Sequence, residues 1–600
     1  MTRTIDQPAT DIIVFWIAGM ASFTLAASWG FWNLMGGLPR IRVSRHSISL
    51  ATGTGIAILA AASVARFWDL ARYPTILDSD EGFFMTAARS ARHGDLPNPF
   101  HLRFFSVPEL YLAVEGLISR PFPDDVASYR ILSAFCGVLT VYATWRIGRR
   151  MLGEAIGLMG AAILAFMPLH LWASRNGMNN VFDSTTLALP ILFVDRAIVR
   201  RSRLDALICG LILGFGQYGY YGARIFLPIL LVCLAVAVVL PTTRISILEA
   251  GRLGLWILVG FASSSAPLIA HYIANPSDFW ARINAVSADN GANDPSLIDR
   301  AANIGRAVIY PIIDENRGGG IGAGFWHGLN PMLGWAIAPL IAIGGVTWLV
   351  WLVLGWVRPG TGKPRTAVLL VVWAAICAGV AQTVEMQSQR FLAVTWIWAL
   401  AAATGIAVIG MAIQRVAPVP VPMPWMRVAG AVAVIAIAIW HAQFFFSEDR
   451  QVEAYGDDRT LAAYDLGTRF EHLDPATYPQ VIVGSPGSFN YNGFGNWILL
   501  APDLVTDVTE LPWDQDFIND PPLMQPDQLL VMSAERPLPE LCSIQRRNPQ
   551  SHIGEAFSRT GVPLYFLFST GRDLILPTGE TPGQTSLQPV ESLDCQGIAA

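Results

Sequence analysis

The fold is decided by residues 47–81, where the apolar run SISLATGTGIAILAAASVARF (47–67) is followed by the acidic cluster Asp78-Ser79-Asp80-Glu81. An apolar run of about 20 residues is long enough for a helix that crosses the ~30 Å hydrocarbon core of a bilayer. Carboxylates at the mouth of such a helix cost desolvation free energy unless a cavity or a partner accommodates them. The cluster therefore marks candidate chemistry at a membrane surface.

The composition of the whole chain indicates a polytopic membrane protein. Of its 600 residues 53% are hydrophobic and only 14% are charged, and the mean hydropathy is +0.44. Soluble domains carry about 25% charged residues. Apolar runs predict about twelve transmembrane helices. They lie near residues 12–34, 47–67, 126–146, 153–173, 180–199, 205–221, 223–241, 253–274, 332–356, 366–384, 391–413 and 427–446.

Charge is distributed unequally between the two sides of these spans. Short loops on one side are rich in arginine, for example around Arg149 and Arg200, whereas acidic residues collect on the other side. Because arginine-rich loops are usually cytoplasmic, the acidic cluster and both termini are predicted to be extracytoplasmic. Lys363 is the only lysine, which suggests a GC-rich bacterial gene and hence a bacterial inner membrane.

The spans and the polar segments divide the chain into six parts. These are two N-terminal transmembrane helices (1–69), an extracytoplasmic loop with the acidic motif (70–125), a transmembrane core (126–274), a second extracytoplasmic loop (275–331), C-terminal transmembrane helices (332–446) and an extracytoplasmic domain (447–600). Helical spacing of apolar residues predicts amphipathic interfacial helices within 70–125. A predicted helix at 458–470 and several buried strands indicate that the last part is a small α/β domain.

Two of the six cysteines, Cys542 and Cys595, fall in the C-terminal domain. The predicted compartment is oxidising, so we expect a disulfide between them. The other four lie in apolar spans and are expected to be packing residues. No cysteine or histidine spacing resembles a metal site, and no cofactor is predicted, although a divalent metal is left open.

The acidic cluster has a structural interpretation and a catalytic one. Asp78 can cap the following helix while Glu81, three residues later, returns the hydrogen bond as a capping box. Asp80 has no such structural task. It is therefore the candidate general base, with Glu81 beside it.

Three arginines lie at predicted extracytoplasmic span ends, against the general trend: Arg175, Arg224 and Arg390. Arg224 follows an aromatic segment that contains Tyr218, Tyr220 and Tyr221. Guanidinium groups bind phosphate well and aromatic rings can hold a sugar or an isoprenoid, so these residues are candidate donor contacts. The alternative is an interfacial aromatic belt with arginines that reach lipid head groups.

The order of several short motifs resembles the GT-C superfamily of membrane glycosyltransferases. The resemblance is to the branch of dolichyl-phosphate-mannose protein mannosyltransferases and aminoarabinose transferases, glycosyltransferase family 39, over residues 70–240 with a weaker echo near 390. The matching motifs are Asp80-Glu81, Pro108-Glu109-Leu110-Tyr111, Tyr129-Arg130-Ile131-Leu132-Ser133, Gly148-Arg149-Arg150-Met151-Leu152-Gly153, Pro168-Leu169-His170-Leu171-Trp172-Ala173-Ser174-Arg175, residues 218–224 and Gln389-Arg390-Phe391-Leu392.

This resemblance implies a GT-C-like fold and inverting transfer of a sugar from a polyprenyl-phosphate donor to an extracytoplasmic acceptor. By position Asp80 would be the base, Glu81 would orient a substrate or hold the loop, and Arg224 or Arg390 would stabilise the phosphate. Two positions depart from the family pattern. Val107 stands where a basic residue is frequent, and Asn179 begins a pair that stands where an aspartate is frequent.

Two other functions remain open at this point. A polymerase or ligase of lipid-linked glycans would move a whole oligosaccharide rather than one sugar. A transporter would carry charged residues near the centres of its spans, and Asp183 and Asp195 are the nearest exceptions to the clustering of charge at span ends. The expected partners are the lipid donor, an acceptor of unknown type and membrane lipid, with no nucleic acid.

Overall fold

A computed structural model describes most of the chain. It covers residues 49–95, 102–103, 107–240, 245–287, 296–313, 337–358, 362–383, 386–416, 422–447, 458–471, 480–484, 508–511, 517–558, 561–570 and 585–595, with single positions at 16, 18–21, 24, 100, 243 and 333. These residues divide into two compact units. The first comprises residues 1–70 and 90–445, and the second comprises residues 71–89 and 446–600.

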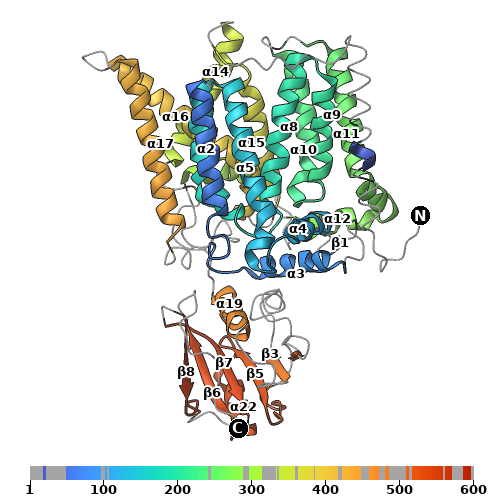
Figure 1. Cartoon of the computed structure of the whole chain (residues 1–600), viewed down its shortest axis with the longest axis vertical. Coiled ribbons are helices and arrows are strands. Elements are labelled where there is room, and N and C mark those ends of the chain that lie inside the picture. Colours follow the sequence, from blue (N-terminus) through green and yellow to red (C-terminus); the bar gives the residue numbers. More distant parts are fainter. Residues whose placement is uncertain are drawn as a thin grey trace. The chain divides into compact units, whose positions relative to one another are not determined.

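The first unit is helical. Its long helices run side by side, with α9 packed along α11, α14 along α16, and α5 against α6 and α8 (Figure 1). The helices are α2 (Leu50–Phe67), α4 (Leu110–Ser119), α5 (Val126–Met151), α6 (Glu154–Phe166), α7 (Pro168–Ala173), α8 (Asn180–Arg200), α9 (Arg203–Gly216), α10 (Phe226–Val239), α11 (Ile247–Ala274), α12 (Pro276–Val286), α13 (Leu297–Ile313), α14 (Ala338–Val357), α15 (Thr366–Val380), α16 (Thr395–Val416) and α17 (Met423–Phe445).

Within the described residues, seven helices are long and apolar enough to cross a membrane. They occupy Leu50–Phe67, Val126–Met151, Tyr221–Val239, Ile247–Ala274, Ala338–Val357, Ser388–Val416 and Trp425–Phe445. The chain is thus a multi-pass membrane protein. Shorter helices stand at other predicted spans, and the span at 12–34 lies mostly outside the described residues, so the count of twelve stays a prediction.

Two predicted spans are shorter in the structure than in the sequence pattern. The span at 153–173 is broken between α6 and α7, where Met167 adopts an extended conformation before Pro168. Proline disfavours the helical conformation in the residue before it, which explains the break. The span at 205–221 ends as a helix at Gly216 and is followed by the short 3₁₀ helix η2 (Tyr221–Ile225).

Glycine lets α9 and α11 approach closely. A Cβ atom on Gly210 would lie 2.0 Å from the carbonyl oxygen of Ile257, and one on Gly214 would lie 1.9 Å from the Ser264 hydroxyl. Small residues four apart on a helix permit this backbone contact between membrane helices. The backbones of α9 and α11 therefore pack closer together than larger side chains at these positions would allow.

The predicted loop at 275–331 contains more regular structure than expected. Residues 276–286 form α12 and residues 297–313 form α13. Part of this segment is bound to the residues that follow α15, because Ser287 makes an isolated antiparallel bridge with Thr383 and Arg300 donates to the Gln382 side chain at 3.1 Å. The described part of this predicted loop is therefore largely helical.

The second unit contains a mixed six-stranded sheet in the order β4-β3-β5-β7-β6-β8 (Figure 1). Its strands are β3 (Gln480–Gly484), β4 (Val508–Leu511), β5 (Gln528–Ser533), β6 (His552–Phe557), β7 (Pro563–Ser569) and β8 (Ser586–Val590). β3 pairs in parallel with β4 and β5, and the remaining pairs are antiparallel. Two helices, α19 (Asp458–Glu471) and α22 (Leu538–Arg547), accompany the sheet.

Alternating side chains divide the sheet between two cores. Val481 and Val483 of β3 pack with α19 on one face, and Ile482 packs with α22 on the other. Cys542 of α22 forms a disulfide with Cys595, the pairing that the sequence predicts. These residues thus form an α/β domain with a helix on each face of its sheet.

The segment 71–89 belongs to this second unit although it is distant in sequence. Ile76 is only 3% exposed and packs in the same core as α19, β3, β5 and β7. The ring of Tyr73 lies 5.4 Å from that of Phe446 in an edge-on arrangement. The acidic cluster therefore follows a segment that is anchored in the C-terminal domain.

Candidate substrate site

The acidic cluster begins helix α3 (Ser79–His93). Asp78 caps this helix, as predicted, by accepting a hydrogen bond from the backbone N–H of Asp80 at 2.8 Å. Glu81 is only 1% exposed, whereas the side chain of Asp80 is half-buried. Of the two predicted catalytic acids, Asp80 is thus the more accessible, and burial of Glu81 favours a structural role.

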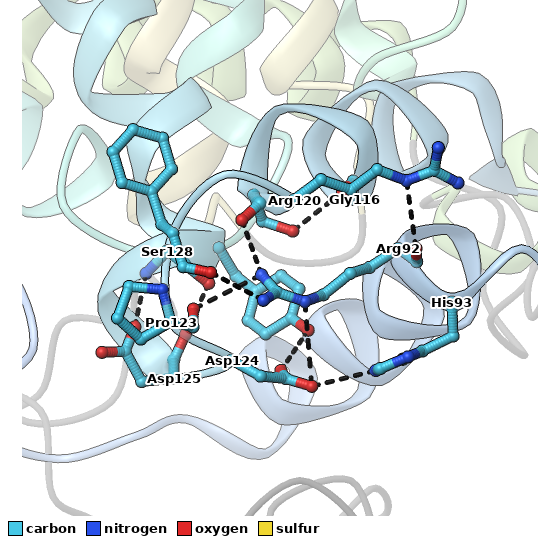
Figure 2. A network of polar contacts seen from close by, with 11 residues as sticks. Arg92, His93, Gly116, Arg120, Pro123, Asp124, Asp125 and Ser128 are labelled. Atoms are coloured by element: carbon cyan, nitrogen blue, oxygen red, sulfur yellow. Dashed lines mark hydrogen bonds and ion pairs between the residues drawn. The ribbon is translucent and has the colours of Figure 1, made fainter.

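The far end of α3 is bound to the corner between α4 and α5 (Figure 2). Arg92 donates to the carbonyl oxygens of Ser119 and Phe122, both at 2.6 Å. It also lies 3.9 Å from the carboxylate of Asp124. Arg120 donates in return to the carbonyl oxygen of Arg92 at 3.0 Å. One arginine on each element therefore binds backbone carbonyls of the other.

Arg175 has a structural role. Its side chain is completely buried and donates to the carbonyl oxygens of Ala65 at 2.7 Å, Trp68 at 2.8 Å and Asp69 at 2.9 Å. These carbonyls lie in or just after the last turn of α2, where the helix leaves carbonyl groups without intrahelical partners. This position does not support a contact between Arg175 and a substrate.

Arg224 joins η2 to the corner between α11 and α12. Its guanidinium group donates to the carbonyl oxygen of Phe279 and, at 3.0 Å, to the hydroxyl of Tyr272. It also lies 5.0 Å from the ring centre of Tyr221 and 4.6 Å from that of Phe279. Such cation–π contacts stabilise a guanidinium among aromatic rings without neutralising its charge.

Two further arginines lie at the same aromatic segment. Arg282 of α12 is 5.6 Å from the ring centre of Tyr221 and interacts electrostatically with Tyr220. Arg390, in the 3₁₀ helix η4 (Ser388–Val394), makes a side-chain hydrogen bond with Tyr220. Arg224, Arg282 and Arg390 therefore surround Tyr220 and Tyr221, and we call this group the arginine cluster.

Tyr218 does not share this environment. It is 1% exposed, and its ring packs 5.8 Å from that of Trp16 and 6.1 Å from that of Phe100. It belongs to an apolar cluster with Leu110 and Leu268. Of the three predicted tyrosines, Tyr220 and Tyr221 thus lie at the arginine cluster, and Tyr218 is a packing residue.

The structure places two of the predicted arginines, Arg224 and Arg390, beside the neighbouring residues Tyr221 and Tyr220, and it adds Arg282. Asp80 and Glu81 belong to the second unit, and the arginine cluster belongs to the first. Within the described parts of the chain, no three His, Cys, Asp or Glu side chains form a group that could hold a metal ion. Sequence reasoning missed Arg282 because its segment was interpreted as an irregular loop.

Comparisons with known proteins bear on the identity of this site. Residues 110–266 match the family model described as dolichyl-phosphate-mannose-protein mannosyltransferase. No curated protein matches the chain.

Several solved structures are similar to this chain at low sequence identity. ArnT from Cupriavidus metallidurans in the apo state is 15% identical, with 87% of this chain and 98% of that chain covered and a TM-score of 0.49. The same enzyme bound to undecaprenyl phosphate is 14% identical, with 86% and 98% covered and a TM-score of 0.49. The apo oligosaccharyltransferase of Archaeoglobus fulgidus is 12% identical, with 90% and 76% covered and a TM-score of 0.47.

At these TM-scores the structural similarities assign neither a substrate nor a residue. The family match includes α4, α5, η2 with Arg224, and most of α11. It thus confirms, over residues 110–266, the resemblance to dolichyl-phosphate-mannose protein mannosyltransferases that the sequence motifs predict.

Proposed function

We propose that the protein is an integral-membrane inverting glycosyltransferase. It transfers a sugar from a polyprenyl-phosphate donor to an acceptor on the extracytoplasmic side of a bacterial inner membrane. The observation that carries this proposal is the arginine cluster around Tyr220 and Tyr221. Guanidinium groups are well suited to a phosphate because they offer several donors in a planar fork.

The arginine cluster fits the leaving group of such a reaction. When the bond between the anomeric carbon and the phosphate oxygen breaks, the electron pair stays on the phosphate. That group needs cationic stabilisation rather than a proton. Arg224, Arg282 and Arg390 are the proposed groups for this role, since all three lie at Tyr220 and Tyr221.

Asp80 is the proposed general base. As the acceptor hydroxyl attacks the anomeric carbon, its proton passes to the Asp80 carboxylate and a new carbon–oxygen bond forms with inversion. The half-buried position of Asp80 in the first turn of α3 leaves it the more accessible of the two acids. General-base assistance of this kind contributes about 10²–10⁴-fold to a rate.

The test is turnover by the purified full-length protein with a panel of polyprenyl-phosphate sugars, with cell-envelope extract as the source of acceptors and products identified by mass spectrometry. We expect Asp80→Asn to reduce turnover about 10²–10⁴-fold. The matched control is Asp95→Asn, because Asp95 is an exposed carboxylate just after the same helix.

The outcomes separate the parts of the proposal. Absence of product with every donor would contradict a glycosyltransferase. Full activity of a well-folded Asp80→Asn variant would remove Asp80 as the base but leave the reaction intact. A product that carries a whole oligosaccharide would instead indicate a polymerase or ligase of lipid-linked glycans.

A further inference from the structure

A buried acid, Asp183, lies beside the arginine cluster and takes no part in the proposed proton transfer or in stabilising the leaving group. Asp183, in the first turn of α8, is 3% exposed. The backbone of Tyr220 makes a hydrogen bond with its carboxylate. A Cβ atom on Gly222 would lie 2.4 Å from its Oδ2, so only glycine at that position leaves the carboxylate where it is.

The other oxygen of this carboxylate is unsatisfied. Oδ1 of Asp183 is buried and has no hydrogen-bond partner among the described residues. Buried polar atoms in folded proteins are nearly always paired, because an unpaired one forfeits its hydration without compensation. An exception therefore points to a group that binds there.

Two neighbouring acceptors share this condition. Oδ1 of Asn180 is buried without a partner in the described structure, and Asn180 stands three residues before Asp183, on the same face of α8. Oε1 of Gln389 is likewise unpaired in the described part of η4. η4 lies against α8 here, since the Ser184 hydroxyl donates to the carbonyl oxygen of Leu392.

Tyr220 connects these acceptors to the arginine cluster. Its backbone binds Asp183, and its side chain binds Arg390. Guanidinium groups and a buried acceptor that has no donor in the described structure therefore meet at Tyr220. A polyprenyl-phosphate sugar has the complementary arrangement, with an anionic phosphate next to a ring of hydroxyl donors.

We propose that Asp183 is a sugar-recognition residue whose Oδ1 accepts a hydrogen bond from a hydroxyl group of the donor sugar, while Arg282 and Arg390 hold the adjacent phosphate. This inference rests on the proposed function and deepens it. It assigns Asp183 to binding rather than to the proton transfer at Asp80. It also gives Gly222 a task, which is to leave space for the carboxylate.

The experiment compares two lipids in nanodiscs that contain the full-length protein. One is undecaprenyl phosphate, and the other is the polyprenyl-phosphate sugar that gives the highest turnover in the panel above. We expect Asp183→Ala to weaken binding of the glycosylated lipid about tenfold and to change binding of undecaprenyl phosphate less than twofold. Gly222→Ala keeps the carboxylate but displaces it, so it should reproduce the selective loss.

Glu154→Gln is the matched control, since it removes a carboxylate charge from a partly exposed ion pair with Arg149. Deoxy analogues of the donor complete a double-mutant cycle, in which one change is made in the protein and the other in the ligand. The analogue that lacks the recognised hydroxyl should bind the wild-type protein about tenfold more weakly than the intact donor does. The Asp183→Ala variant should bind this analogue and the intact donor equally well. Equal weakening of both lipids, or no weakening, would overturn the role of Asp183. Lack of turnover by the wild type with every donor would instead contradict the proposed function.

Discussion

Replacement of Arg92 by methionine should release the C-terminal end of α3. Arg92 binds the carbonyl oxygens of Ser119 and Phe122 at 2.6 Å and that of Pro123 at 3.3 Å (Figure 2). A hydrogen bond from a charged donor contributes about 1.5–3 kcal/mol, and the lower value applies here because the surroundings are partly hydrated. The ion pair with Asp124, at 3.9 Å and 27% exposed on the acidic side, adds at most about 1 kcal/mol.

The two short bonds together give a loss of about 3 kcal/mol, which is roughly 150-fold in the equilibrium for local opening. Hydrogen exchange of the full-length protein, measured by mass spectrometry, reports this quantity for peptides from the end of α3 and the start of α5. We expect Arg92→Met to accelerate exchange there by about two orders of magnitude and to leave α14 unchanged.

A second variant separates geometry from charge. Arg92→Lys keeps the positive charge but loses the planar fork that reaches several carbonyl oxygens at once, so it should restore less than half of the lost protection. The exposed Arg415 supplies a control, because Arg415→Met removes a cation at the far end of another helix. Complete rescue by lysine, or unchanged exchange in Arg92→Met, would refute the reasoning.

Three other predictions concern Asp465, the disulfide and Arg282. Asp465→Ala should destabilise the C-terminal sheet by about 3–5 kcal/mol, because it leaves the 1%-exposed Arg469 side chain without its carboxylate partner at 2.9 Å. The measurement is the rate of hydrogen exchange in β7, and an acceleration of less than tenfold would contradict this prediction. Replacement of both Cys542 and Cys595 by serine removes a disulfide between residues 53 positions apart and should lower the stability of the domain by about 4 kcal/mol. Unchanged hydrogen exchange in the double variant would contradict this prediction. Arg282→Gln should raise KM for the lipid donor about tenfold or more with an intact fold by circular dichroism, and an unchanged KM would remove Arg282 from the phosphate site.

The hydrogen bonds around Asp465 indicate a structural role for this residue. Its carboxylate accepts from Arg469, from the hydroxyl of Tyr565 and from the hydroxyl of Thr585. Burial raises the pKa of the Tyr565 hydroxyl, which therefore stays protonated and donates. The group is a satisfied structural network in the α/β domain.

Much of the helical unit could be predicted because span length and hydropathy are local properties. Helices stand at the predicted spans within the described residues, and the deviations have local causes such as Pro168. The role of Arg175 could not be predicted, since it depends on a contact with carbonyl groups more than a hundred residues earlier. In the sequence, Arg175 is simply an arginine at a predicted extracytoplasmic span end, against the usual distribution of positive charge.

The candidate site was predicted in part for a similar reason. Arg224 and Arg390 stood out because their position conflicts with the usual charge distribution of membrane loops. Arg282 gave no such signal, because it lies in a segment without an evident pattern. In the sequence, Asp183 is only a charged residue near the end of a span. Its unpaired oxygen depends on the positions of η2 and η4 beside α8, which the sequence does not give.

The anchoring of Ile76 in the core of the C-terminal domain changes how this protein can be divided into modules. Residues 71–89 and 446–600 belong to one compact unit, although nearly 360 residues separate them in the chain. A chimera that exchanges only the C-terminal domain with a relative would leave Ile76 facing a foreign core, so residues 71–89 must be exchanged with it. Truncation of the domain also removes the anchor of the segment before Asp80, so loss of activity in a truncated protein would not by itself assign a role in the reaction to the domain.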